Sequence, residues 1–183
     1  MAPIDINGVS PLSYAGQSLS SPGATGISVD YSAANSWAPN GSATDDNAAY
    51  MSYLDDPGAG YSVTIHGLSS LFGAGYSITA LQATDTVGAT FANVLIYAGA
   101  GTSGTLLATL SDGSPLQFAD SNGTYGDTNA SNTLTVDTIT IVGAARNGDE
   151  RSTLAGLAIV PEPATLPLLG AGMAILLRRR RRN

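Results

Sequence analysis

The chain has 183 residues, with 14 acidic and seven basic side chains and no cysteine. This length is typical of one domain with a short appendage, and the lack of cysteine excludes disulfides, thiolate nucleophiles and cysteine metal sites. Hydrophobic residues make up 43% of the chain and charged residues only 11%, so Ser, Thr, Asn and Gly supply most of its polarity, as is typical of an extracellular β-protein.

Charge is divided unequally between residues 1–160, which we call the body, and residues 161–183, the tail. The body has 13 acidic side chains and two arginines, a net charge of −11, whereas the tail has five arginines and one glutamate, a net charge of +4. A body so acidic lacks the cations that bind phosphates, which excludes nucleic acid as its partner. The asymmetry predicts two parts with different roles.

Hydrophobic periodicity predicts an all-β body. Weak strand candidates come first along the chain, at residues 3–8, 26–31 and 49–54. Stronger candidates, in which β-branched or aromatic residues alternate with polar ones, follow at residues 61–66, 76–79 and 133–142, and two further strands are expected at residues 104–110 and 152–160. Residues 91–98 are apolar on both faces, which is typical of a central strand.

The alternation in residues 133–142 changes phase near Asp137. Leu134 and Val136 fall on one face of an ideal strand, and Ile139 and Ile141 fall on the other. The pattern predicts a β-bulge or a bend at this point.

Turn-forming clusters separate the strand candidates, at residues 55–60, 111–115, 120–127 and 146–150. Residues 10–25 and 33–48 are rich in Ser, Gly, Ala and Asn and are predicted to be loops. Regularly spaced short strands are typical of a sandwich or barrel. We therefore expect a single antiparallel β-sandwich of jelly-roll type in residues 1–160, with a short hydrophobic helix at the C-terminus.

The tail has the order of a sorting signal. Residues 164–177 carry no charge, and as a helix they would span about 21 Å, short of the roughly 30 Å hydrocarbon core of a membrane. The arginines that follow would stop transfer on the cytoplasmic side; they are Arg178, Arg179, Arg180, Arg181 and Arg182. A processing site, a marginal transmembrane helix and a charged stop favour sorting over permanent anchoring.

Pro161-Glu162-Pro163, the apolar stretch and the arginine cluster resemble the PEP-CTERM sorting signal of Gram-negative bacteria. The resemblance implies recognition by exosortase, a membrane-embedded protease or transpeptidase, with Pro161, Glu162 and Pro163 as its substrate motif. It also implies transient inner-membrane anchoring through the C-terminal helix, then release to the cell surface or the extracellular matrix. Members of the family are associated with exopolysaccharide and biofilm, which makes a structural or adhesive role the expectation.

The body is similar, more loosely, to the sandwich domains found with this signal, which resemble lectin-type or galactose-binding jelly rolls. The similar segments are residues 34–56, 61–78 and 151–163. Proteins with this signal carry an N-terminal secretion signal, but residues 1–10 have no basic region and no apolar region. We therefore expect the secretion signal to be missing from this sequence.

The sequence gives little support for catalysis, so we expect the body not to be an enzyme. His66 is the only histidine and lies at the end of a predicted strand, with no G-x-S-x-G motif beside it. The body has a single glutamate, Glu150, and nothing singles out a carboxylate pair for glycoside hydrolysis. Among acidic turns, Asp120, Asn122 and Asp127 alternate around a glycine and are candidate ligands for a structural Ca²⁺, with a solvated turn as the alternative. Other acidic candidates are Asp45, Asp46, Asp55 and Asp56.

Carbohydrate binding is the alternative function. Sandwich domains often hold sugars with exposed aromatic rings beside Asn or Asp side chains. The best candidate ring is Trp37, with Asn35, Asn40 and Tyr53 as further candidate glycan contacts. Tyr125 and Phe72 are the other aromatic residues predicted to lie in or beside loops. The opposing interpretation of Trp37 is that it closes one end of the sandwich as a buried side chain.

Overall fold

The computed structural model describes residues 17–20, 27–37, 50, 53–55, 60–112, 118–120, 123–145, 148 and 150–162, with the backbone alone in 17–20 and 118–120. Within these residues the chain forms antiparallel strands and one short helix, so the predicted all-β class is confirmed. The helix is α1 (Leu68–Leu71). The strands are β1 (Gln17–Ser20), β2 (Ser28–Ala33), β3 (Asn35–Trp37), β4 (Tyr53–Asp55), β5 (Tyr61–His66), β6 (Tyr76–Thr84), β7 (Val94–Ala98), β8 (Leu106–Leu110), β9 (Phe118–Asp120), β10 (Gly123–Asp127), β11 (Ile139–Gly143), β12 (Thr153–Leu154) and β13 (Gly156–Pro161).

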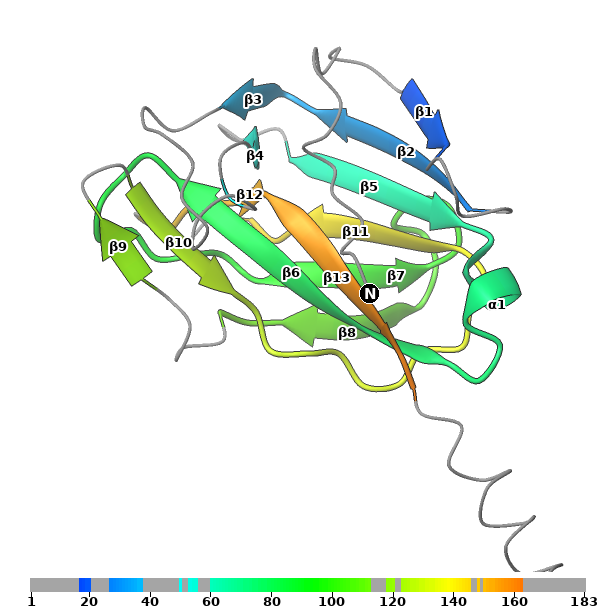
Figure 1. Cartoon of the computed structure of the whole chain (residues 1–183). Coiled ribbons are helices and arrows are strands. Elements are labelled where there is room, and N and C mark those ends of the chain that lie inside the picture. The colour runs from blue at the N-terminus through cyan, green and yellow to red at the C-terminus, as the bar shows by residue number, and fades with distance from the viewer. Residues whose placement is uncertain are drawn as a thin grey trace, which may run out of the picture.

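The strands form three sheets. The large sheet has the order β1-β2-β5-β11-β7-β8, the small sheet β13-β6-β10-β9 and the end sheet β12-β4-β3. Figure 1 shows β6 and β13 of the small sheet crossing over β11 and β7 of the large sheet. This is a sandwich, as predicted, and its jelly-roll subtype stays a prediction.

The core lies between the large and small sheets. In β5, Val63 and Ile65 have no exposed surface, while Thr64 between them faces outward and is partly exposed. They belong to one cluster with Ile78 and Leu157 of the small sheet. Each such side chain contributes about 1.5–3 kcal/mol when it is fully buried, so the interior between the two sheets is the main source of stability.

The phase change predicted near Asp137 is a bend at which the chain passes from one sheet to the other. Leu134 bridges to Tyr76 of the small sheet, and Ile139 pairs with Ile65 of the large sheet. Each of the two sheets turns its own inward side toward the core, so Leu134 and Ile139 are both buried although their phases differ.

The bend also holds α1. The Asp137 carboxylate accepts hydrogen bonds from the hydroxyl and, at 3.2 Å, from the main-chain N–H of Ser69. These bonds hold the pKa of the Asp137 carboxyl below its usual value.

Several predicted turns and loops contain strands instead. Residues 120–127 were expected to form a turn, but β10 lies there between β6 and β9. Its Gly123 serves a close approach to the carbonyl of Thr84 rather than a tight turn. Residues 10–25 contain β1 and residues 33–48 contain β3, so the loop predictions for these ranges are wrong where the strands lie. The candidate strand at residues 3–8 lies outside the described residues, as does the predicted helix at residues 164–177.

Candidate functional site

The start of the predicted sorting signal belongs to the folded sheet. β13 is an edge strand of the small sheet and pairs with β6 along its whole length, from Gly156 opposite Leu81 to Pro161 opposite Tyr76. Beyond Pro161, the main-chain N–H of Glu162 donates to the carbonyl oxygen of Gly75 at 3.0 Å. The strand expected at residues 152–160 is therefore two strands, β12 and β13, and the second continues into the tail.

Pro161 fits this position because β13 lies at the edge of its sheet. Proline has no N–H to donate to a neighbouring strand, which confines it to edge strands and strand ends. Pro161 and Glu162 are both partly exposed. The first two residues of the Pro-Glu-Pro motif are therefore held by the sheet. Pro163 and the arginine cluster lie outside the described residues.

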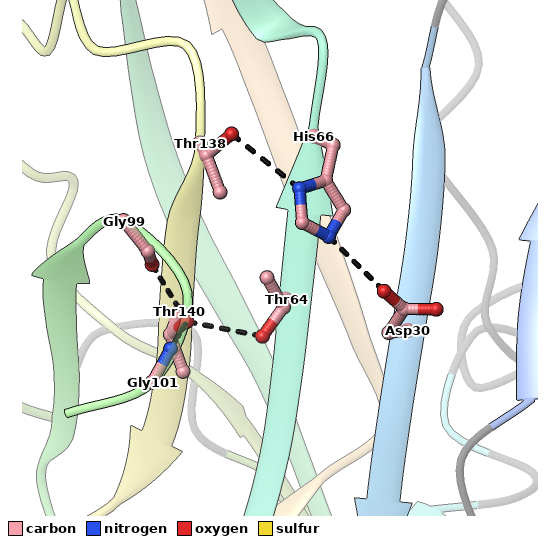
Figure 2. A network of polar contacts seen from close by, with 7 residues as sticks. All are labelled: Asp30, Thr64, His66, Gly99, Gly101, Thr138 and Thr140. Carbon is pink, nitrogen blue, oxygen red and sulfur yellow. Dashed lines mark hydrogen bonds and ion pairs between the residues drawn. The ribbon is translucent and has the colours of Figure 1, made fainter.

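The outer face of the large sheet carries a network of polar side chains, shown in Figure 2. His66 Nε2 lies 3.0 Å from a carboxylate oxygen of Asp30 on β2, and His66 Nδ1 lies 3.4 Å from the hydroxyl of Thr138. The side chains of His66 and Asp30 are 34% and 47% exposed. His66 is the last residue of β5, which agrees with its interpretation as a surface histidine at a strand end. Asp30 was not identified from the sequence because it is 36 residues away.

The buried part of this network centres on Thr140 of β11. Its hydroxyl donates to the carbonyl oxygen of Gly99 at 2.8 Å and accepts from the N–H of Gly101 at 2.8 Å. It also lies 3.0 Å from the hydroxyl of Thr64. Although Thr140 points to the outer face, its exposure is 0%, and its hydroxyl ties residues 99–101 to the sheet (Figure 2).

Replacing Thr140 with valine, which has nearly the same shape, is expected to lower the free energy of unfolding by about 0.5–1.5 kcal/mol. The change would remove the partner of the Gly101 N–H and of the Gly99 carbonyl, which are partly accessible to water, and would leave the buried Thr140 position without its hydrogen bonds. Chemical denaturation measures the effect. Thr109→Val on β8 is the matched control because Thr109 is exposed, and equal stabilities of the two variants would contradict the role of the Thr140 hydroxyl.

Two of the candidate glycan contacts lie at an accessible position. Trp37 ends β3 and is 45% exposed, so the interpretation of Trp37 as a buried closure of the sandwich is wrong. Asn35 lies at the other end of β3, where its side-chain oxygen accepts a hydrogen bond from the N–H of Ser36 at 3.0 Å. The two residues pair with β4, with Trp37 opposite Tyr53 and Asn35 opposite Asp55.

Tyr53 does not offer a ring face to a sugar. It is 1% exposed, and its burial raises the pKa of its hydroxyl to about 12. Tyr125 and Phe72, predicted to lie in or near loops, are also buried, because Tyr125 packs with Tyr53 and Phe72 packs against Tyr76. Asn40 lies outside the described residues. The glycan prediction therefore depends on Trp37 and Asn35.

The acidic residues have an arrangement that the sequence did not suggest. Asp127 ends β10, and the next residue, Thr128, forms an isolated β-bridge with Asp112, which follows the end of β8. Each aspartate has a side-chain oxygen that is buried and has no hydrogen-bond partner among the described residues. Burial and the neighbouring Asp127 charge, in that order, raise the pKa of Asp112. Asn122 and the Asp120 side chain lie outside the described residues, and the part of the chain that the structure describes has no group of three or more metal-ligating side chains, so the Ca²⁺ site at Asp120, Asn122 and Asp127 stays a prediction.

We expect Asp112→Asn to stabilise the metal-free protein by up to about 1 kcal/mol at neutral pH, because the charge of a partly exposed carboxylate is well screened. A carboxyl whose pKa is raised by folding destabilises the fold as pH rises through that pKa, so the gain should vanish below the unfolded pKa, near 3.8. Thermal melting between pH 3 and pH 7 in EDTA tests this. If Asp127 binds Ca²⁺, wild type should gain stability when Ca²⁺ is added and Asp127→Asn should gain less. If added Ca²⁺ does not change the melting temperature of wild type, the Ca²⁺ prediction is wrong.

An antiparallel sandwich whose last strand runs directly into Pro-Glu, an apolar stretch and five arginines has the design of an exported domain with a C-terminal sorting signal. Residues 160–182 match the family model described as the PEP-CTERM protein-sorting motif. No curated protein and no solved structure matches the chain significantly.

The chain therefore carries a PEP-CTERM sorting motif, and the predicted sorting signal is confirmed. The motif implies export, transient anchoring in the membrane and processing by exosortase. Within residues 17–162, as far as the structure describes them, no helix is long and apolar enough to cross a membrane.

Proposed function

We propose that the processed β-sandwich is a structural or adhesive component of the cell surface or extracellular matrix of a Gram-negative bacterium, held in exopolysaccharide or biofilm, and that it is not an enzyme. The observation that carries the proposal is the direct passage of β13 into the sorting motif. Because β13 continues into the motif without a linker, the sandwich is the folded part of the chain directly N-terminal to the processing site.

The surface of the sandwich supports this role. On the outer face of the large sheet, Ser62, Thr64 and His66 alternate with buried residues, and Asp30 lies opposite Thr64 on the neighbouring strand. Hydroxyl, carboxylate and imidazole groups spread over a sheet can exchange hydrogen bonds with the many hydroxyl groups of a polysaccharide. The body charge of −11 keeps such a domain soluble at the surface of a cell.

A dedicated glycan site is the second candidate function, and the 45% exposure of Trp37 favours it. An exposed indole beside Asn35 provides a ring for stacking on a sugar and an amide for hydrogen bonding. Such a site would give selective binding of particular sugars rather than general retention in the matrix.

Polysaccharide pull-down and a glycan array, with and without Ca²⁺, separate the two candidates. If Trp37 stacks on a sugar, Trp37→Ala should weaken binding at least about tenfold, which corresponds to about 1.4 kcal/mol. Leu106→Ala is the matched control, because Leu106 is a similarly exposed hydrophobic residue, at 48%, on the distant edge strand β8. Equal retention of wild type and both variants in the matrix fraction supports the structural role, and absence from that fraction contradicts both candidates.

A further inference from the structure

The sorting motif and the folded sandwich share one strand. Val160, the first residue of the matched motif, pairs with Ser77 of β6, and Pro161 pairs with Tyr76. The N–H of Glu162 then donates to Gly75 at 3.0 Å. The first three residues of the motif are therefore held by main-chain contacts to the beginning of β6, and these contacts do not depend on the motif's side chains.

The part of β6 that holds the motif is fixed to the core by hydrogen bonds and ring packing. Tyr76 has no exposed surface, exchanges main-chain hydrogen bonds of 2.9 and 2.7 Å with Leu134, and donates its hydroxyl to the carbonyl of Val136 at 2.8 Å. Its ring packs against Phe72 at 5.7 Å between centroids.

Gly75 is equally constrained. It has a φ of +107°, and a Cβ there would lie 2.7 Å from Thr133 and 3.1 Å from the Leu134 carbonyl. Its N–H donates to the Phe72 carbonyl at 2.8 Å. The segment that receives Glu162 therefore has little freedom to move away from the core.

A peptide bond inside such a sheet is a poor substrate. An enzyme that cuts a peptide must bring a nucleophile to the carbonyl carbon and usually binds the flanking chain as an extended strand, through the same N–H and C=O groups that pair strands in a sheet. Pairing with β6 occupies groups on one side of β13 up to Pro161, and the core covers its inner face. Cutting within β13 would require the strand to separate first, with the loss of the buried Ile159.

We propose that β6, through Gly75 and Tyr76, positions the sorting motif so that exosortase cuts on the C-terminal side of Glu162. In the cut, the carbonyl carbon loses its bond to the following nitrogen, which leaves as an amine with an added proton. The acyl group passes to water or to an acceptor amine. The mature protein then keeps every residue of β13. This inference rests on processing by exosortase, which the motif implies.

The test uses the full chain with an added secretion leader, expressed in a host that carries exosortase. Mass spectrometry of the mature protein should give a C-terminal residue at Glu162 or beyond. A mature protein that ends at Pro161 or earlier would overturn the inference while leaving processing itself intact. If wild type is not processed at all while a reference protein with this signal is, the exosortase assignment fails instead.

An insertion separates the effect of the sheet from that of the motif. Six Gly/Ser residues placed between Val160 and Pro161 leave Pro161, Glu162, Pro163 and the rest of the tail unchanged but move Glu162 away from Gly75. We expect additional mature ends before Glu162, including ends within the insertion, and free-peptide hydrogen exchange at the Glu162 amide. The same six residues between Thr102 and Ser103, in an exposed turn, are the matched control and should leave the cut unchanged. The same mature end, after Glu162, in the linker variant and wild type would show that the sheet does not set the boundary.

Discussion

Gly123→Ala is expected to unfold much of the sandwich. Gly123 begins β10 with a φ of +155°, and a Cβ there would lie 2.0 Å from the carbonyl oxygen of Thr84 and 3.0 Å from its carbonyl carbon. The obstructing atoms are main chain in β6, which cannot rotate away as a flexible side chain could. Moving them would separate β10 from β6, where Thr124 pairs with Thr84, and would expose the buried ring of Tyr125.

The expected loss is on the order of 4 kcal/mol or more, at the upper end for a single substitution. The full stability of a domain is about 5–15 kcal/mol, and with no cysteine no disulfide offsets the loss. Thermal melting followed by circular dichroism measures the effect.

Gly88→Ala is the matched control for this prediction. Gly88 also has a positive φ, +79°, but no atom would lie within 4 Å of its Cβ. Backbone strain alone should cost about 1–2 kcal/mol there. If the two variants melt within a few degrees of each other, the clash with Thr84 is not the cause of the damage.

Local sequence patterns were sufficient to predict which side chains are buried wherever a strand with regular alternation faces the core. Tyr61, Val63 and Ile65 were predicted to face inward because they recur at every second position, and the structure confirms this burial. The bend near Asp137 was predictable for the same reason, since a change of phase must appear when a chain moves from one inward-facing sheet to another. The sorting motif was predictable because its order of segments is local in sequence.

Features that depend on distant contacts were not predictable in this way. Gly123 lies among residues that are typical of a turn. It is part of a strand because β6, which comes much earlier in the chain, lies directly beside it. The partner of His66 on β2 and the approach of Asp112 to Asp127 are likewise set by strand order. The sequence also shows an apparent boundary after Val160, whereas the pairing of β13 continues through Pro161.

Replacing Pro161, Glu162 and Pro163 together with alanine is expected to block processing while the sandwich stays folded. The sheet holds this region through main-chain groups, and alanine keeps the N–H of Glu162 that donates to Gly75. Removing the side chains therefore tests recognition by exosortase separately from folding. The unprocessed chain should accumulate in the membrane fraction, with processing at least about tenfold slower, which corresponds to a loss of about 1.4 kcal/mol of transition-state binding. Pulse-chase labelling measures the rate, and the melting temperature of the variant checks the fold.

Two changes to the arginine cluster distinguish the motif from its membrane context. Arg178–Arg182 replaced by five lysines keeps the positive charge that holds this end on the cytoplasmic side, so processing should continue. Five glutamines remove that charge and should allow the apolar stretch to pass through the membrane, which takes the motif out of reach of a membrane-embedded enzyme. The alanine variant should then accumulate in the membrane, whereas the glutamine variant should appear uncut outside it. Normal processing of the alanine variant would show that these three residues are not what exosortase reads.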